Sequence, residues 1–290
     1  MAVIGGSGAY ELDLGKIGTV LDEIAVDTPF GRVDGILLIE PGEHAGPLAF
    51  VSRHGREGYR VGAWDVNYRA LIYALKEIGT TRLIAWSGPG AVDQRFEPGD
   101  YVLPDGIIDL TRHRQDTFYH GTGLGFIRQH PVFCPDLHAV MLRVLASRGN
   151  KYHDGGVYAA TEGPRLETAD EVRMISRLGG DLVGMTLAPE VFLARELEIC
   201  YHPLCYVANW AEGVGELPFR GGELFEGMLE GDRVERVGEA VQGLADVVRE
   251  LAALIDPSAA RQCPCSQAML RYRREGRVGE DWHGWIGLPE

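Results

Sequence analysis

The sequence predicts an α/β protein, a single domain in which a central mixed, twisted sheet is flanked by helices. Two observations support this fold class. Short apolar segments bounded by glycine or polar residues alternate with longer segments that carry an amphipathic pattern. The chain has 290 residues, of which 45% are hydrophobic and 24% charged, and this is enough for one large core.

The expected strands and helices follow one another along the chain as far as residue 255. Strands are expected at residues 3–4, 36–39, 49–52, 82–86, 101–103, 156–159, 182–185 and 205–208. Helices are expected at residues 64–78, 136–148, 168–178, 189–198 and 233–255.

Several of the expected helices have recognisable ends. Thr168 precedes acidic residues, as at a capped helix start, and Pro189 suits a first helical position. Gly79 and Gly149 stand where helices should stop. The segment 233–255 carries its apolar residues on one face, which predicts a helix packed on the sheet.

The composition changes after residue 255. We expect residues 1–255 to form the domain and residues 256–290 to form a polar, arginine-rich C-terminal extension. This extension either docks on the body or on a neighbouring molecule, or is partly disordered. Within the domain, the glycine- and proline-rich segment 214–222 predicts a mobile loop.

The net charge of −14 argues against two classes of partner. Nucleic acids and anionic membrane surfaces both select basic faces, whereas 42 acidic residues outnumber 28 basic ones here. The sequence has no apolar run of about 18 residues, and its N-terminus lacks the pattern of a secretory signal. We therefore expect a cytoplasmic protein.

Four short turns with small, hydroxyl or cationic side chains follow expected strands. They are Gly5-Gly6-Ser7-Gly8, Ser52-Arg53-His54-Gly55, Ser87-Gly88-Pro89-Gly90 and Met185-Thr186. Hydroxyls, exposed peptide N–H groups and a guanidinium that meet at strand ends suit a small tetrahedral oxyanion. The sequence therefore predicts an inorganic phosphate site at this edge of the sheet.

The candidate site residues also have ordinary structural explanations. Arg53 suits a surface ion pair, and His54 could be a hydrogen-bonded structural histidine. Met185 could fill the core, and Glu167 precedes a helix, where negative charge is favourable. Asn209, at the end of a buried strand, could bond to the neighbouring backbone rather than to a ligand.

The motifs taken together are specific in their order and spacing. They are Gly5-Gly6-Ser7-Gly8, Arg53-His54-Gly55, Val66-Asn67-Tyr68, Pro98-Gly99-Asp100, Glu162-Gly163-Pro164-Arg165, and Gly184-Met185-Thr186 followed by Pro189-Glu190. Through them the chain resembles the trimeric purine nucleoside phosphorylases over residues 2–255. Within that family it is most similar to the 5′-methylthioadenosine/methylthioinosine phosphorylase branch.

The resemblance implies the nucleoside phosphorylase fold and phosphorolysis, in which a purine nucleoside and phosphate give free base and ribose 1-phosphate. It implies no metal and no organic cofactor, with inorganic phosphate as the co-substrate. It implies phosphate contacts at Ser7, Arg53, His54, Ser87, Gly88 and Thr186. It also implies nucleoside contacts at Leu166, Glu167, Met185, Asn209 and Ala211, with Asn209 and His54 as the catalytic residues.

Three residues depart from the members of the family that act on 6-aminopurines. Those members carry aspartates where this chain has Asn209 and Ala211, and a small hydroxyl residue where it has Glu167. Asn209 can donate to a purine O6 and Glu167 can accept from N1–H, so we expect a preference for inosine, guanosine or 5′-methylthioinosine. The alternative is a 5′-methylthioadenosine phosphorylase. The pocket for the 5′ substituent is expected to come from residues 214–228 and from a neighbouring subunit. Both a hydroxyl and a methylthio group remain possible as that substituent.

The resemblance also implies a homotrimer or a dimer of trimers, with Phe126 reaching into a neighbour's site. Two other classes of function remain as alternatives. One is a catalytically silent module that binds a nucleoside or phosphate, and the other is a nucleosidase that uses water.

The chain contains five cysteines, Cys134, Cys200, Cys205, Cys263 and Cys265. Buried thiols in a reducing cytosol are one explanation. The pair Cys263-Pro264-Cys265 supplies only two ligands, so we expect no metal there. A disulfide would suit an intracellular protein of a thermophile. The pair resembles a motif that forms disulfides in heat-stable archaeal members of the family, and Cys200 and Cys205, which flank an expected strand, could join it.

Overall fold

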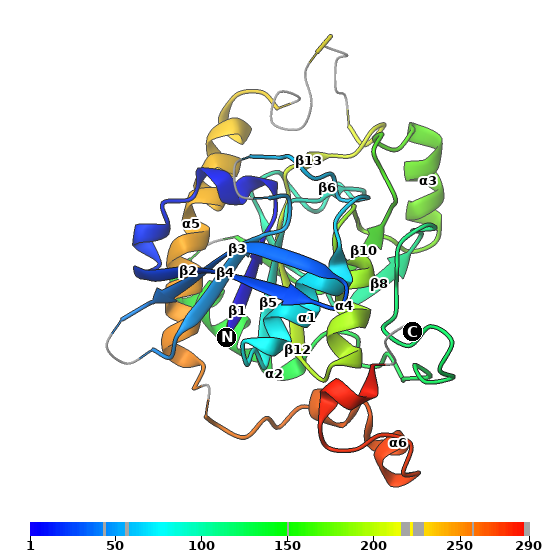
Figure 1. Cartoon of the computed structure of the whole chain (residues 1–290). Coiled ribbons are helices and arrows are strands. Elements are labelled where there is room, and N and C mark those ends of the chain that lie inside the picture. Colours follow the sequence, from blue (N-terminus) through cyan, green and yellow to red (C-terminus); the bar gives the residue numbers. More distant parts are fainter. Residues whose placement is uncertain are drawn as a thin grey trace.

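The computed structural model describes residues 1–42, 45–55, 58–149, 151–215, 221–222, 229–256 and 258–286. Its strands form a larger and a smaller sheet, and helices cover both faces of the larger one (Figure 1). The predicted α/β fold class is therefore confirmed.

The larger sheet is mixed. In spatial order its strands are β2 (Thr19–Thr28), β3 (Gly31–Glu40), β4 (Leu48–Ser52), β1 (Ala2–Gly5), β5 (Arg82–Ser87), β12 (Cys200–Tyr206), β7 (Tyr101–Leu103) and β9 (Tyr152–Asp154). β1 runs parallel to β4 and β5, and β5 runs parallel to β12. Because parallel strands end at the same edge, the turns that follow β1, β4 and β5 lie together there.

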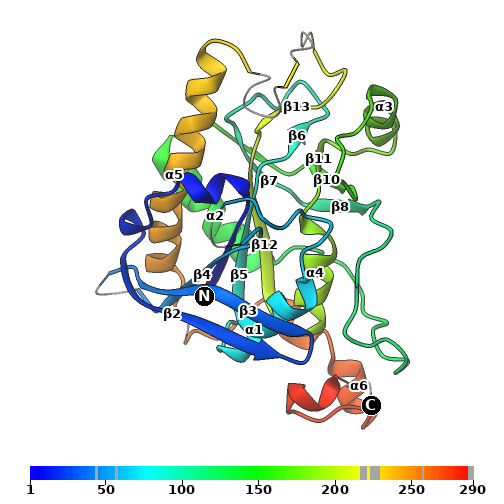
Figure 2. The ribbon, with the colours of Figure 1, turned by 45° about the horizontal axis from the view of Figure 1, so that its top comes forward.

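The smaller sheet contributes further turns to the same region. Its strands are, in spatial order, β13 (Asn209–Trp210), β6 (Gly90–Ala91), β11 (Leu182–Gly184), β10 (Val157–Ala160) and β8 (Gly106–Asp109). β10 and β11 are parallel, with Ala160 opposite Gly184, and β13 lies beside the short strand that follows β5. Figure 2 shows β6, β11 and β13 at the end of the molecule to which the central strands point.

The main helices are α1 (Tyr68–Glu77), α2 (Pro135–Arg148), α3 (Ala169–Arg177), α4 (Leu187–Glu196), α5 (Asp232–Leu254) and α6 (Leu270–Arg274). Short 3₁₀ helices are η1 (Ser7–Glu11), η2 (Leu14–Lys16), η4 (Pro264–Gln267) and η5 (Trp282–Trp285). The predicted start of α3 has a full capping box. The Thr168 hydroxyl accepts from the Glu171 N–H, and the Glu171 carboxylate accepts from the Thr168 N–H.

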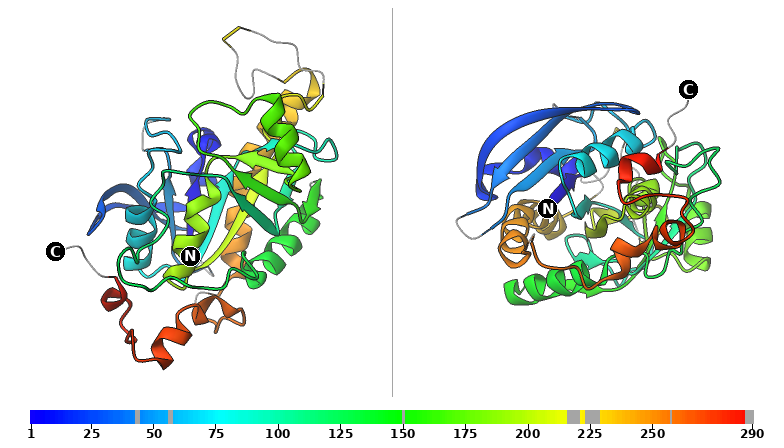
Figure 3. Two further views of the ribbon diagram at one scale, coloured as in Figure 1. Left: turned by 90° about the vertical axis from the view of Figure 1, so that its right-hand side faces the viewer. Right: turned by 60° about the horizontal axis from the view of Figure 1, so that its bottom comes forward.

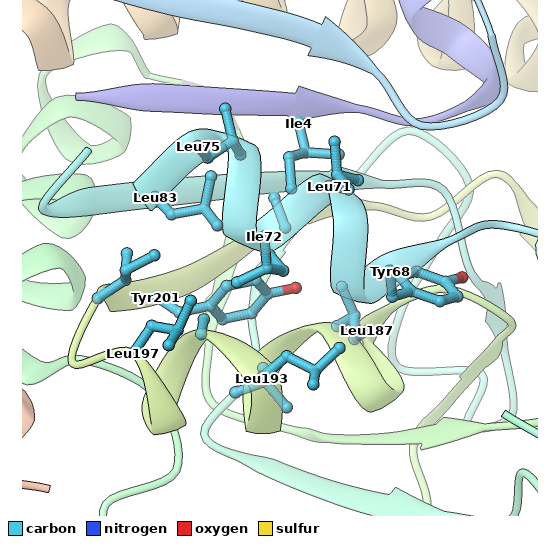
Figure 4. Packing of buried hydrophobic residues seen from close by; sticks show 14 of the residues in the cluster. Ile4, Tyr68, Leu71, Ile72, Leu75, Leu83, Leu187, Leu193, Leu197 and Tyr201 are labelled. Carbon is cyan, nitrogen blue, oxygen red and sulfur yellow. The ribbon is translucent and has the colours of Figure 1, made fainter. Parts of the chain in front are cut away.

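The core lies on the two faces of the larger sheet. One cluster joins the sheet to α1 and α4, and the other joins it to α2 and α5. Figure 4 shows the first cluster, in which side chains of both helices meet those of the central strands, among them Ile4, Leu71, Ile72, Leu75, Leu83, Leu187, Leu193, Leu197 and Tyr201. This packing holds the strand ends in fixed positions.

Some predicted boundaries are wrong, for local reasons. The helix expected from residue 64 begins at Tyr68, because the Asn67 side chain accepts from the Ala70 N–H and caps it there. Pro189, by contrast, follows a kink in α4 at Ala188, whose backbone is extended (φ −106°, ψ 136°), and so stands at the first position of the regular helix, as expected. The strand expected at 205–208 is β12, which begins at Cys200, so Cys200 and Cys205 lie within one strand and do not flank it.

Strand β2 was not expected from the sequence. It is the outermost strand of the larger sheet, and most of its side chains are exposed. Its apolar residues are not confined to one face, since Val20 is 45% and Leu21 is 59% exposed, so the segment lacks the alternation that marks a half-buried strand. β3 is likewise longer than the apolar segment 36–39 because its first half extends beyond the core with β2.

The C-terminal extension packs on the body. Residues 258–286 run across one end of the molecule, as both views of Figure 3 show. Met269, Tyr272 and Trp285 are buried, and Arg273 forms a bidentate ion pair with Glu198 at 3.0 Å. Docking on the body is thus the alternative that the structure favours for these residues.

Two further sequence expectations concern loops and membranes. The loop predicted at 214–222 falls largely outside the described residues, as does most of the 214–228 segment expected to line the 5′ pocket. Among the helices that the structure describes, none has the length and apolar character needed to cross a bilayer.

Candidate active site

A cavity of about 500 Å³ opens where the ends of the strands of both sheets meet. Its lining includes all the residues that the sequence assigned to phosphate, namely Ser7, Arg53, His54, Ser87, Gly88 and Thr186. It also includes those assigned to the nucleoside, namely Leu166, Glu167, Met185, Asn209 and Ala211. These residues come from six separate segments of the chain, and the fold brings them to one place.

Arg53 lies at the buried end of the cavity and is paired with Glu190. Its Nε donates to Glu190 Oε2 at 2.8 Å and its Nη2 donates to Oε1 at 2.9 Å, and both side chains are fully buried. Burial disfavours the charge of Arg53, but the adjacent carboxylate outweighs it and raises the pKa of the guanidinium. Tyr201 donates to the same carboxylate at 2.7 Å. Arg53 is therefore a fixed, buried cation. The surface ion pair, which was the alternative explanation for this residue, is wrong.

The remaining face of Arg53 lies toward the glycine turns. Nη1 is 3.4 Å from the Trp86 carbonyl. A Cβ at Gly6 would stand 2.9 Å from that carbonyl and 3.5 Å from Nη1, and a Cβ at Gly88 would stand 2.6 Å from the ring of Tyr206. Protein atoms already occupy both positions, so only glycine lets the two turns pack this closely against Trp86 and Tyr206 at the edge of the cavity.

Three hydroxyls meet beside this cation. Ser87 Oγ lies 3.0 Å from Thr186 Oγ1, and Tyr158 OH lies 3.4 Å from each of them. All three side chains are buried, and burial raises the pKa of Tyr158, so its phenol stays protonated. Hydroxyl groups can each donate to an anion, and the cluster adds uncharged donors to the guanidinium.

His54 has a defined protonation state. Its Nδ1 lies 2.9 Å from the Val61 carbonyl, which can only accept, so Nδ1 carries the proton. Burial, followed by the charge of Arg53, lowers the pKa of His54 to about 4. The ring is therefore neutral at neutral pH, and its Nε2 can accept a hydrogen bond but cannot donate one. Tyr59 stacks on the ring at 4.2 Å.

The other end of the cavity carries an acid and an amide. The Thr161 hydroxyl donates to Glu167 Oε1 at 2.6 Å, which directs the carboxylate away from the cap of α3. Asn209 is 7% exposed, and its amide nitrogen donates to the Trp210 carbonyl at 3.0 Å. The backbone thus orients Asn209 within the cavity lining, which is the structural explanation that the sequence offered for this residue.

Several lining residues were not identified from the sequence. Tyr59, Trp64 and Glu212 line the cavity together with the buried Tyr158. Tyr158 lies within an apolar strand, and such a position predicts a core residue rather than a site residue. Trp64 could have been identified from the sequence, because it lies two residues before the motif that begins at Val66. A Cβ at Gly163 would stand 3.1 Å from the Trp64 ring, so that glycine permits the contact.

Comparisons with known proteins agree with this geometry. A family model described as the phosphorylase superfamily matches residues 1–251. A probable 6-oxopurine nucleoside phosphorylase of Korarchaeum cryptofilum is 37% identical, over 94% of this chain and 98% of its own length. The 6-oxopurine nucleoside phosphorylase of Pyrococcus furiosus is 38% identical, over 78% and 85%. A probable S-methyl-5′-thioinosine phosphorylase of Methanopyrus kandleri is 37% identical, over 93% and 97%.

The fold also matches that of a solved nucleoside phosphorylase. A methylthioadenosine phosphorylase from an antarctic soil metagenomic library superimposes with a TM-score of 0.80 at 25% identity, covering 98% of this chain and 96% of that one. The family match spans both sheets and all the segments that form the cavity. The chain belongs to the phosphorylase superfamily, among its nucleoside phosphorylases.

Proposed function

We propose that this chain is a purine nucleoside phosphorylase that cleaves 6-oxopurine nucleosides to free base and ribose 1-phosphate or its 5-methylthio derivative. The observation that carries the proposal is one cavity with two chemically different ends. A buried guanidinium, hydroxyls and glycine turns form the first end, and a carboxylate with an amide forms the second.

The first end suits inorganic phosphate as the co-substrate. Arg53 has five N–H donors, of which two are used on Glu190 and one on Trp86, and the others are left for an anion. Ser87 and Thr186 add hydroxyl donors, and Ser7 and Gly88 add groups on the turns. The neutral His54 suits an acceptor for the P–OH proton of a phosphate dianion, or for a ribose hydroxyl.

The second end suits the purine. Cleavage of the glycosidic bond builds positive charge on the ribose and negative charge on the departing base. A phosphate held below the sugar stabilises the first charge and then bonds to C1′, and a donor at the base stabilises the second. Asn209 is the residue proposed for the base edge, and Met185 is proposed to lie against the ribose. Positioning and fixed dipoles supply this catalysis.

The base preference rests on Glu167 and Asn209. A 6-oxopurine has an acceptor at O6 and a donor at N1–H, which match an amide N–H and a carboxylate. In adenine, N1 is an acceptor and the 6-amino group is a donor, so an acceptor would face the carboxylate and a donor would face the amide N–H, a mismatch that is costly in a half-buried site. Relatives named as acting on 6-oxopurine nucleosides and on S-methyl-5′-thioinosine support this preference. A relative in Thermofilum pendens named S-methyl-5′-thioadenosine phosphorylase, at 36% identity, keeps that activity as the alternative.

The test is a panel of inosine, guanosine, adenosine and both 5′-methylthio analogues, each with and without phosphate. We expect release of base from the 6-oxo substrates only when phosphate is present. Release without phosphate would indicate a nucleosidase, and binding without release would indicate a silent module. The variant Arg53→Ala is expected to raise the phosphate KM steeply, and an unaltered KM would remove Arg53 from the site.

We further propose that the protein is a homotrimer or a dimer of trimers. The side chain of Phe126 is 84% exposed, while its backbone N–H donates to Tyr272 of the C-terminal extension at 2.9 Å. An exposed aromatic side chain on a fixed backbone suits an intersubunit contact. Light scattering of the purified protein tests the assembly, and a monomer at micromolar concentration would contradict it.

A further inference from the structure

Four of the five cysteines converge at one buried point outside the active site. The ligand atoms of Cys134, Cys200, Cys263 and Cys265 all lie within 4.8 Å of one another, and all four residues are buried. The sulfur atoms of Cys200 and Cys263 are 3.3 Å apart. The sequence suggested only the adjacent pair at 263 and 265 and therefore no metal, but the fold adds two further thiols.

The thiols come from three elements that are far apart in the chain. Cys134 is the residue before α2, Cys200 opens β12, and the other two belong to the C-terminal extension around η4. The elements are also joined without the sulfurs. The Cys134 N–H donates to the Tyr201 carbonyl at 2.8 Å, and the Cys263 N–H donates to Asp136 at 3.0 Å. The cluster is therefore preorganised by the backbone.

We propose that these four cysteines bind one Zn²⁺ in a tetrahedral structural site that fastens the C-terminal extension to the body. With Zn–S bonds of about 2.3 Å, the edges of a regular tetrahedron are about 3.8 Å. The separation of Cys200 and Cys263 is 3.3 Å and no pair is more than 4.8 Å apart, so the cluster is compact enough for one such ion. A disulfide needs about 2.05 Å, which is shorter than the separation of Cys200 and Cys263. Four protein ligands leave no open position, as in structural zinc sites.

The surroundings favour thiolates. Metal binding converts four thiols and Zn²⁺ into a tetrathiolate complex of charge −2 and releases four protons. Arg261 places Nη1 at 3.9 Å from Cys200 Sγ, and Cys134 stands at the N-terminus of the 14-residue α2, where the helix dipole stabilises negative charge. Figures 1 and 2 show the extension at the end of the molecule opposite β6 and β13, so the proposed role is structural and separate from catalysis.

The experiment measures metal content and thiol count on the full-length protein. The protein is purified under reducing conditions without chelator, incubated with equimolar Zn²⁺, dialysed and analysed for metal. Thiols are then titrated in denaturant with chelator but without reductant. We expect about one zinc per chain and five reactive thiols. The double variant Cys263→Ser/Cys265→Ser is expected to lose the zinc, and the control Cys205→Ser, which removes the one cysteine outside the cluster, is expected to keep it.

Three results would overturn the proposal. They are less than about a tenth of a zinc per chain after reconstitution, a thiol count near one, which indicates two disulfides in place of a metal site, and full zinc retention in the double variant. The first two are read on the unmodified protein, so they decide the question even where the double variant does not fold. Activity plays no part in the readout, so the outcome is independent of the proposed function.

Discussion

Replacing Glu190 by glutamine would test whether the anion end of the cavity contains a buried ion pair. The substitution keeps the shape of the side chain but removes its charge. Arg53 would then be a fully buried cation whose two strongest partners, at 2.8 and 2.9 Å, are lost or weakened. Tyr201 would also lose a charged acceptor. The variant should therefore be markedly less stable when no anion is bound.

The magnitude follows from the burial of the pair. Removing one partner of a buried ion pair costs about 3–5 kcal/mol, because the other charge stays buried without compensation. For a chain of this size, each kcal/mol lowers Tm by roughly 2–4 °C. The expected change is therefore a loss of about 3–5 kcal/mol in the free energy of unfolding, and a decrease in Tm of roughly 6–20 °C.

The assay is urea unfolding with and without phosphate. Phosphate should stabilise Glu190→Gln more than the unmodified protein, because the bound anion replaces the missing carboxylate as the partner of Arg53. The matched control is Glu275→Gln, which breaks the exposed pair with Arg271 at 2.9 Å and should cost no more than about 1 kcal/mol. A loss below about 1 kcal/mol in Glu190→Gln would refute the buried pair. Equal stabilisation of both proteins by phosphate would refute the position of Arg53 at the anion site.

Three further predictions concern the base, the glycine turns and pH. Asn209→Asp should shift the ratio of kcat/KM for adenosine over inosine upward by roughly 10-fold or more; an unchanged ratio in a base-release assay would contradict the base-edge argument. Gly88→Ala places a Cβ 2.6 Å from Tyr206 and should destabilise the protein by about 1–3 kcal/mol, whereas Gly238→Ala, with open space around it, should not; urea unfolding compares the two. The pKa of His54 falls from 6.5 to about 4 on folding, so between these values the unfolded chain binds a proton that the folded protein does not. Stability should therefore fall as pH decreases through this window, and less steeply in His54→Asn; parallel pH profiles would show that His54 does not titrate as stated.

The sequence predicted the location of the active site better than the boundaries of the elements. Ser7, Arg53 and Ser87 each lie at or just after the end of a buried apolar strand. Parallel strands end at the same edge of a sheet, so the convergence of these residues follows from local patterns alone. Glu167 likewise lies in the cavity lining because Thr168, and not Glu167, caps α3. Their positions can be predicted because each one is fixed by the strand end or helix start beside it.

Other parts of the structure depend on contacts between distant segments, which local patterns do not contain. Glu190 is the partner of Arg53 across 137 positions of sequence, and nothing near Glu190 in the chain marks that contact. Tyr158 lies in an apolar segment that predicts a core strand, although its hydroxyl lies 3.4 Å from those of Ser87 and Thr186 in the cavity lining. The cysteine cluster is the clearest case, since Cys134 and Cys200 meet Cys263 only after the extension docks. Tertiary contacts of this kind need the fold before they can be recognised.

The Arg53–Glu190 pair gives the anion end of the cavity no net charge, and this affects catalysis. Arg53 and Glu190 sum to zero charge, so a phosphate dianion there would be held largely by dipoles and hydroxyls, including those of Ser87 and Thr186. A surplus cation would bind the anion more tightly, but it would also cancel part of the negative charge that stabilises the developing ribose cation. Glu190→Gln, which creates that surplus, should therefore lower the phosphate KM without raising kcat. An increase in kcat would show that charge, and not positioning, limits the reaction.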